Sequence, residues 1–429
     1  MTHLNLISGL GIVAFVVFAW SLSTDRLNVN RRVVAWGVGL QLLIAAVVFH
    51  FPGVPSAMLW LNNAVVGLLQ SSQEATTFLF GDLGDGSKSK FILAFQALPL
   101  MVVFSALMTV LYHIGLLPWL IRQMAKVFTR LMGISGAESL CVSGSVFVGV
   151  EGAVMAGPTF GKMTRSELMM LFTAYMATIA STVFAAYVFF LKDVFPNIAG
   201  HLITASFLSA PAAVVMAKLL LPESETPATL GVDVHPAHDK TDNIIEAIID
   251  GATKGVKLCV AVATLLLAVI GLLAMFNYCL GGVVEWKFGV ENFGLENILG
   301  WIFYPFAWLM GVESGDVGWV SELLGQRVVA TEIPSYLALK DRIADPAIAV
   351  SPRSAVIVAY ALCGFAHLPA MAITMGGFVG LAPERRTDFS RLAPRALLAA
   401  TLACLMTGAV AGLMYTGGET LLTKEGGRH

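Results

Sequence analysis

Long apolar runs separated by short polar segments dominate the sequence. A helix that spans a bilayer needs about 20 apolar residues. Eight runs are suited to spanning, at residues 4–22, 33–51, 91–121, 168–191, 201–221, 258–280, 355–377 and 396–415. Segments 52–70 and 297–312 mix apolar residues with prolines and tryptophans, which is typical of helices at the membrane interface. The pattern predicts an all-α polytopic membrane protein with eight transmembrane helices and interfacial helices.

Two apolar stretches are interrupted, and each holds one acid. Residues 146–158 read V-F-V-G-V-E-G-A-V-M-A-G-P around Glu151, and residues 330–334 read A-T-E-I-P around Glu332. Glycine and proline break helices, and an acid at membrane depth is costly and usually functional. Irregular backbone at that depth is tolerated only inside protein or beside a water-filled cavity. We therefore expect two re-entrant hairpins, at 136–161 and 317–339.

The segments that follow the two hairpins have the same order. A hairpin, a span with a polar or broken centre and a further span occupy 136–221 and again 317–415, with the second broken span interrupted at 364–369. The two hairpins are expected to enter from opposite faces of the membrane. Inverted repeats with broken helices near the midplane are typical of secondary transporters.

The distribution of basic residues predicts the orientation in the membrane. Arginines and lysines gather at 25–32, 122–130 and 383–395, and the positive-inside rule places such short loops in the cytoplasm. The resulting topology puts both termini outside, together with a polar loop at 71–90. It also predicts a cytoplasmic loop at 222–257 that contains a short amphipathic helix at 244–249.

Composition excludes several other classes of protein. Hydrophobic residues make up 57% of the chain and charged residues 13%, about half the charged share of a soluble domain. The net charge of −2 implies no nucleic-acid partner. The five cysteines lack metal-ligand spacing, and no nucleophile–base constellation or phosphate-binding loop indicates an enzyme.

Several strings make the chain resemble the concentrative nucleoside transporters. They include A-Y-A-L-C-G-F-A at 359–366, V-F-V-G at 146–149, T-R-S-E-L at 164–168, T-I-A at 178–180 and L-L-G-Q at 323–326. The resemblance covers nearly the whole chain. It implies the bacterial eight-span form, a homotrimer in which a scaffold holds a moving, elevator-type transport domain. The implied divisions are 1–130 (scaffold), 131–221 (first half of the transport domain), 222–312 (scaffold) and 313–429 (second half).

The same resemblance implies a role for particular residues, and this chain departs from the family at several of them. The substrate-binding positions are Gly149, Val150, Glu151, Thr331, Glu332, Phe365, His367 and Ala370. The base-reading amide of the first hairpin is absent, His367 stands for an asparagine, and Ala370 stands for a serine. The coupling-ion positions are Ser145, Val148, Thr182 and Val183, with Ser145 in place of an asparagine.

Each candidate residue also has a purely structural interpretation. Glu332 can accept hydrogen bonds from the vicinal hydroxyls of a ribose, or it can pair with Arg327 or a helix N-terminus. Glu151 can bind substrate, carry a proton or simply pack in a protonated form. His367 and Phe365 can contact substrate or fill the core. Ser145 and Thr182 can supply oxygen ligands or helix-packing contacts.

The sequence therefore predicts a secondary active transporter in the bacterial cytoplasmic (inner) membrane. It would import nucleosides in symport with Na⁺ or H⁺, without any other cofactor, and its partners would be the lipid bilayer and two further copies. One alternative is a transporter of the same fold for another small polar, nucleoside-like substrate. A second is a membrane-embedded sensor that has lost transport.

Overall fold

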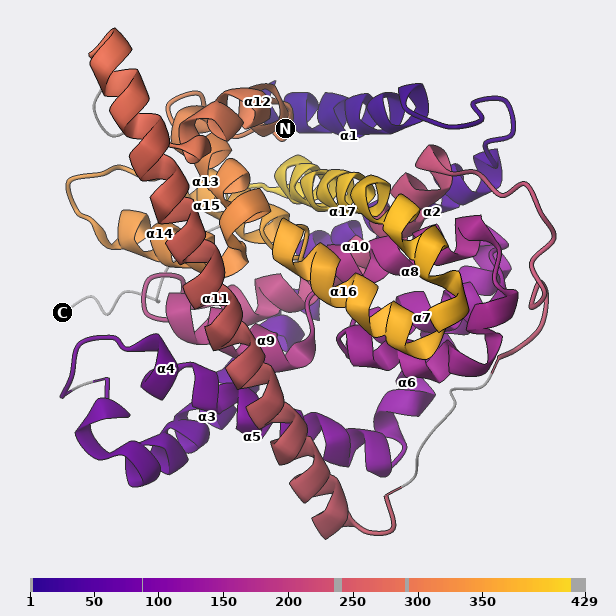
Figure 1. The fold of residues 1–429 in the computed structure, drawn as a ribbon, viewed down its shortest axis with the longest axis horizontal. Helices are drawn as coiled ribbons and strands as arrows, with labels where there is room; N and C mark the ends of the chain where they lie inside the picture. The colour runs from indigo at the N-terminus through magenta and orange to yellow at the C-terminus, as the bar shows by residue number, and fades with distance from the viewer. Residues whose placement is uncertain (1–2, 87, 235–240, 290–292, 418–429) are drawn as a thin grey trace.

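The computed structural model describes residues 3–86, 88–234, 241–289 and 293–417, and within these ranges the regular structure is helical (Figure 1). The helices are, in order, α1 (His3–Ser21), α2 (Arg31–His50), α3 (Val54–Phe80), η1 (Gly81–Leu83), α4 (Leu93–Gln96), α5 (Leu98–His113), α6 (Leu116–Met132), α7 (Gly136–Ser145), η2 (Val150–Lys162), α8 (Arg165–Ala177), α9 (Ser181–Leu191), α10 (Ile198–Leu220), α11 (Ile244–Phe288), α12 (Leu295–Leu309), α13 (Val317–Ala330), α14 (Glu332–Ala344), α15 (Pro352–Ala361), α16 (Leu368–Leu381), η3 (Pro383–Arg385) and α17 (Arg386–Met414).

The predicted spans are recovered as helical segments. In the described part of the chain, seven segments are long and apolar enough to cross a membrane: His3–Ser21, Arg31–His50, Leu93–His113, Arg165–Leu191, Ile198–Leu220, Ile244–Lys287 and Pro383–Met414. The remaining predicted span, 355–377, is divided between α15 and the short apolar helix α16. Its predicted interruption at 364–369 falls at the gap between these helices.

Several predicted boundaries are wrong. The amphipathic helix at 244–249 and the span at 258–280 form one 45-residue helix, α11, because no proline interrupts the sequence between them. Helix α3 continues through Phe80, into the stretch predicted as a loop. The span 91–121 ends at His113, since Gly115 adopts a left-handed φ of 85° before α6 begins. Helix α17 begins at Arg386, well before the predicted start at residue 396.

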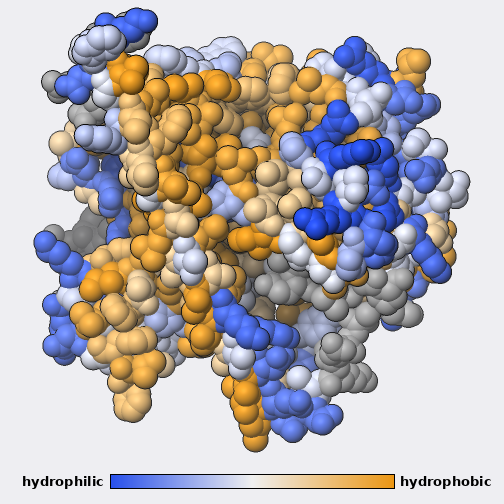
Figure 2. Space-filling model, in the orientation of Figure 1, coloured by the Kyte–Doolittle hydropathy of each residue, from blue (hydrophilic) through white to orange (hydrophobic). Residues whose placement is uncertain are grey.

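The helices surround a densely buried centre formed by α10, α8 and the second half of α17. Helix α2 packs along α10, α1 along α17, α12 along α13, and α5 along α11. Helix α11 crosses the whole molecule diagonally in Figure 1. Only 6% of its most apolar 18-residue stretch is buried. Figure 2 shows mainly apolar residues on the side where α11 runs and a polar region on the opposite side. A large apolar surface therefore faces away from the protein core.

Two spans and two predicted hairpins are each divided into two helical segments. Helices α8 and α9 are separated at 178–180, and α15 and α16 at 362–367. The predicted second hairpin consists of α13 and α14, which meet at Thr331. The predicted first hairpin consists of α7, a turn at 146–149 and the 3₁₀ segment η2. Their re-entrant placement in a bilayer stays a prediction.

A buried ionic network fixes the start of the first hairpin. The Nζ atom of Lys218 lies 2.5 Å from Glu138 Oε1 and 3.2 Å from Glu223 Oε2. Glu138 forms a capping box with Ser135 at the N-terminus of α7, and the Ser135 hydroxyl donates to Glu167 Oε1 over 2.6 Å. The network joins the first turns of α7 and α8 to the end of α10. It holds both half-helices in a fixed position relative to the core.

A second buried network centres on Arg353, in the first turn of α15. Its guanidinium donates to the carbonyls of Gly311 and Gly412, at 2.7 and 2.8 Å, and to Ser8 Oγ at 2.9 Å. Asn5 accepts a further bond from Arg353 at 3.2 Å. These contacts tie α1 and the end of α12 to α15 and α17. They join segments on both sides of the predicted division between scaffold and transport domain.

Candidate substrate and ion sites

The second hairpin places Glu332 in the first turn of α14, immediately after a strained residue. Thr331 has a φ of 107°, a value that residues with a side chain rarely adopt. Glu332 and Thr331 are each only 3% exposed. Among the described residues, no hydrogen-bond partner lies near the buried Thr331 hydroxyl. Strain and an unpaired hydroxyl beside a buried acid are typical of functional sites.

Two side chains from different elements hold the Glu332 carboxylate. His367 Nε2 lies 2.7 Å from Oε2, and the Tyr187 hydroxyl of α9 donates to Oε1. The alternative pairing with Arg327 is not observed among the described residues, where that guanidinium instead donates to the Ala361 carbonyl over 2.5 Å. The carboxylate is therefore positioned by α9 and by the start of α16.

His367 occupies the N-cap of α16 and uses both ring nitrogens. Its Nδ1 accepts a hydrogen bond from the Ala370 N–H over 3.1 Å. Its Nε2 lies 2.7 Å from Glu332 Oε2. His367 therefore joins the first turn of α16 to the buried acid, at the position where the family has an asparagine.

Phe365 and Ala370 complete the second half of the site. The Phe365 ring is half-buried and meets the His367 ring edge-on, with centroids 6.3 Å apart. The Ala370 side chain is buried and offers no polar group. The structure thus gathers Thr331, Glu332, Phe365, His367 and Ala370 at the facing breaks of α13/α14 and α15/α16.

Residues of the first hairpin line a separate cavity. Val148, Gly149 and Thr182 line a space of about 420 Å³, whose opposite wall is formed by α5 and α11. The Val150 and Glu151 side chains lie outside the described part of the structure, although their backbone opens η2. The structure does not bring this cavity lining into contact with Glu332 through any described hydrogen bond.

The predicted ion-site residues lie where α7 ends beside the break of α8 and α9. The Ser145 hydroxyl donates to the Val142 carbonyl at 2.9 Å, and the Ser145 carbonyl accepts from the Thr178 hydroxyl, also at 2.9 Å. The Phe147 carbonyl accepts from the Ser181 hydroxyl at 2.7 Å. Internal hydrogen bonds thus already engage oxygens that could bind a cation.

The backbone N–H of Val183 also forms a hydrogen bond inside the protein. The Val183 N–H donates to the Ala180 carbonyl at 3.1 Å, and the Val183 side chain is buried. Thr182 is half-buried and faces the cavity described above.

Three residues that form hydrogen bonds at these sites were not predicted from the sequence: Tyr187, Thr178 and Ser181. The last two belong to the polar patch at 178–182, which signals the break. Tyr187 gives a weaker signal, because a tyrosine in an apolar span is usually a packing residue. Only the fold shows its hydroxyl beside Glu332.

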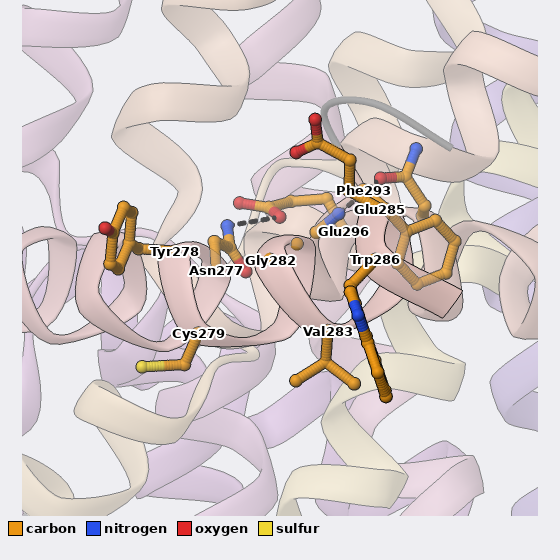
Figure 3. A pocket seen from close by; sticks show the side chains of 12 residues that line it. Asn277, Tyr278, Cys279, Gly282, Val283, Glu285, Trp286, Phe293 and Glu296 are labelled. Carbon is orange, nitrogen blue, oxygen red and sulfur yellow. Dashed lines mark hydrogen bonds between the residues drawn. The ribbon is translucent and has the colours of Figure 1, made fainter. Parts of the chain in front are cut away.

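A larger surface hollow, of about 800 Å³, lies away from these sites at the end of α11. Figure 3 shows Asn277 on α11 pointing toward Glu296, to which its amide donates over 2.8 Å. The Asn277 carbonyl oxygen also accepts from the Leu295 N–H at 2.9 Å. These bonds fasten α12 to α11. The hollow is a feature of the helix junction, remote from the buried acid.

Comparisons with known protein families cover almost all of the chain. Residues 10–83 match the N-terminal region of Na⁺-dependent nucleoside transporters, and residues 201–412 match their C-terminal region. Residues 94–194 match a nucleoside recognition, or Gate, domain.

Individual relatives agree with the family matches. An uncharacterized transporter of Haemophilus influenzae is 34% identical over 96% of this chain and 98% of its own length. Human solute carrier family 28 member 3 is 34% identical over 96% of this chain, which spans 60% of that protein. Rat sodium/nucleoside cotransporter 1 is 32% identical, and the chain spans 64% of its length.

Solved structures of CNTnw share the fold. The inward-facing, substrate-bound state aligns with a TM-score of 0.86, and an outward-facing variant with 0.87; both are 34% identical and are matched over 96% of this chain and 98% of CNTnw. These relatives are transporters rather than enzymes, and their helical architecture is that of this chain. The chain therefore belongs to the concentrative, Na⁺-dependent nucleoside transporter family.

Proposed function

We propose that this protein imports nucleosides across the cytoplasmic membrane by cation symport. The observation that carries the proposal is the Glu332 carboxylate, buried at the meeting point of two pairs of half-helices. A carboxylate can accept hydrogen bonds from two vicinal hydroxyls, and a ribose offers such a pair. The family membership supports nucleosides as the substrate class.

Na⁺ is the coupling ion that the family favours. Ser145, Val148, Thr182 and the Val183 carbonyl remain the proposed ligands, because hydroxyl and carbonyl oxygens suit a hard cation. A proton is the second candidate, supported by the internal hydrogen bonds that engage the Ser145 oxygens. Replacing Na⁺ at fixed pH separates the two: sodium coupling predicts loss of uptake, and proton coupling predicts loss only when the pH gradient collapses.

The proposed transport cycle is an elevator movement of a body that includes both hairpins and the broken helices. A cavity between the first hairpin and helices α5 and α11 supports a sliding boundary at that surface. The largely exposed apolar face of α11 supports contact with lipid or with two further copies in a homotrimer.

Uptake in a bacterial strain that lacks its own nucleoside carriers tests the function. We expect saturable uptake of uridine or adenosine by the unmodified protein. Glu332→Gln should lower uptake efficiency roughly 10- to 100-fold, because hydrogen bonds to a neutral amide are weaker than those to a carboxylate. Glu322→Gln is the matched control, since Glu322 is an exposed acid of the same hairpin. Unmodified uptake no higher than that of Glu332→Gln would refute nucleoside import.

A transporter of the same fold for another small polar substrate is the second candidate function. The observation in its favour is the changed site chemistry. The run Gly149-Val150-Glu151 is one residue shorter than the family's motif and lacks its amide, and His367 and Ala370 stand for an asparagine and a serine. A panel of compounds in a thermal-shift assay on purified protein distinguishes the two. Stabilisation by a non-nucleoside, with none by any nucleoside, would favour this candidate.

A further inference from the structure

The two side chains that contact Glu332 have different surroundings. Tyr187 is fully buried, whereas Phe365, next to the buried His367, is half-buried and Leu368 is 46% exposed. The partly exposed side chains near the acid thus lie on the His367 side. The oxygen that His367 contacts, Oε2, is the one that a substrate hydroxyl can take over.

The ring of Tyr187 is held in place on its face and at its edge. It stacks on Tyr336 of α14, with ring centroids 4.7 Å apart and planes 28° apart, and Phe190 packs beside it. Tyr336 is itself anchored, because its hydroxyl donates to the Ala359 carbonyl of α15 at 3.0 Å. Packing leaves the Tyr187 hydroxyl little freedom to point anywhere except toward Glu332 Oε1.

We propose that Tyr187 is a positioning residue that fixes Glu332 Oε1 and so orients the carboxylate for two substrate hydroxyls. The proposal rests on the proposed function of nucleoside transport. Tyr187 belongs to α9, in the first repeat, and Glu332 belongs to α14, in the second. The hydrogen bond therefore joins the two halves of the transport body at the substrate site.

Orientation matters most for a substrate that engages both carboxylate oxygens. A carboxylate free to rotate still makes one good hydrogen bond, but it makes two only if its plane is fixed. Loss of the Tyr187 hydroxyl should thus weaken the binding of a ribonucleoside, which has two vicinal hydroxyls, more than the binding of a 2′-deoxynucleoside, which has only one of them. This change in selectivity would not follow from a merely structural role.

The test compares Tyr187→Phe with Tyr336→Phe in the full-length protein reconstituted in liposomes. Both residues are buried members of one ring stack and each loses one hydroxyl, but only Tyr187 donates to Glu332. We expect Tyr187→Phe to raise the KM for adenosine roughly 10-fold, as loss of a hydrogen bond to a charged group does. The KM for 2′-deoxyadenosine should change less than about 3-fold, and Tyr336→Phe should leave the ratio of the two KM values unchanged.

Three outcomes would overturn the proposal. If the unmodified protein transports neither compound, the proposed function itself fails and this inference fails with it. If the unmodified protein transports adenosine and Tyr187→Phe keeps the same KM ratio, only the inference fails. An equal change of the ratio in both variants would assign the effect to ring packing. Thermal unfolding of both variants in detergent checks that each one folds.

Discussion

A buried carboxylate contacted by two side chains can exchange one contact for a substrate and keep the other. Glu332 has this arrangement, since Tyr187 and His367 contact different oxygens. His367 adds a second role, because its Nδ1 accepts from the Ala370 N–H and caps α16. At the residue scale, the histidine in place of the family's asparagine keeps a polar side chain beside the acid.

The proposed ion site differs from the family's at Ser145. Ser145 offers a hydroxyl where the family has an amide oxygen, and that hydroxyl already donates to Val142. We predict that Ser145→Asn lowers the Na⁺ concentration for half-maximal uptake several-fold, since one added charge–dipole bond contributes about 1–1.5 kcal/mol. Ser145→Ala should raise it. Uptake measured against Na⁺ at fixed pH checks both, and an unchanged Na⁺ dependence in the two variants would remove Ser145 from the ion site.

At the scale of the elements, half-helices bring helix ends and irregular backbone into the interior. The ends of α13, α14, α15 and α16 meet beside Glu332. A carboxylate in the first turn of α14 suits the positive end of that helix, and a guanidinium at the last carbonyl of α15 suits its negative end. The breaks thus place charges where helix dipoles favour them.

The junction of α13 and α14 stores strain at Thr331. We predict that Thr331→Gly is at least as stable as the unmodified protein, because relief of about 1–3 kcal/mol of strain outweighs roughly 0.5–1 kcal/mol of added chain entropy. Its substrate KM should nevertheless rise, since the buried hydroxyl is lost. Ala330→Gly, one position earlier in helical conformation, should be less stable.

Thermal unfolding in detergent and uptake kinetics measure these two effects. The strain argument fails if Thr331→Gly unfolds at a lower temperature than Ala330→Gly. An unchanged substrate KM in Thr331→Gly would show that the Thr331 hydroxyl does not contact the substrate.

At the scale of the whole molecule, buried hydrogen bonds indicate which helices would share a body in the proposed elevator movement. A surface that slides cannot keep a network such as that of Arg353, which joins α1 to α12, α15 and α17. The boundary between α5 and α9, by contrast, contains a cavity. Under the proposed movement we place α1 with α15 and α17 and keep α5 and α11 in the scaffold, so the Asn277 bonds between α11 and α12 would have to open.

Cross-linking tests this division in a variant whose five native cysteines are replaced. Cysteines at Met108 of α5 and Met155 of η2, which line the same cavity, should stop uptake when joined and restore it after reduction. Cysteines at Gly9 and Leu413, where a Cβ on Gly9 would lie 3.6 Å from the Leu413 side chain, should leave uptake intact when joined. Arrest by the second pair would return α1 to the scaffold, and free uptake with the first would contradict the elevator movement.

The sequence by itself determined the spans, the breaks and the two acids. Apolar runs of bilayer length and helix-breaking residues are local features, so the helices around 201–221 and the break at 364–369 could be predicted directly. Helix ends were less predictable: α11 and α17 extend beyond their apolar cores because polar residues also form helix when nothing interrupts them.

Only the tertiary structure decided which side chains complete the site. Tyr187 and Glu332 are 145 positions apart, and a tyrosine in an apolar span carries no local mark of the acid it contacts. The contact between His367 and Glu332 likewise depends on the fold, which brings the start of α16 beside α14. The acid was visible in the sequence because an isolated charge stands out in an apolar stretch. Its partners were not, because a hydrogen bond depends on where the folded chain brings two atoms together.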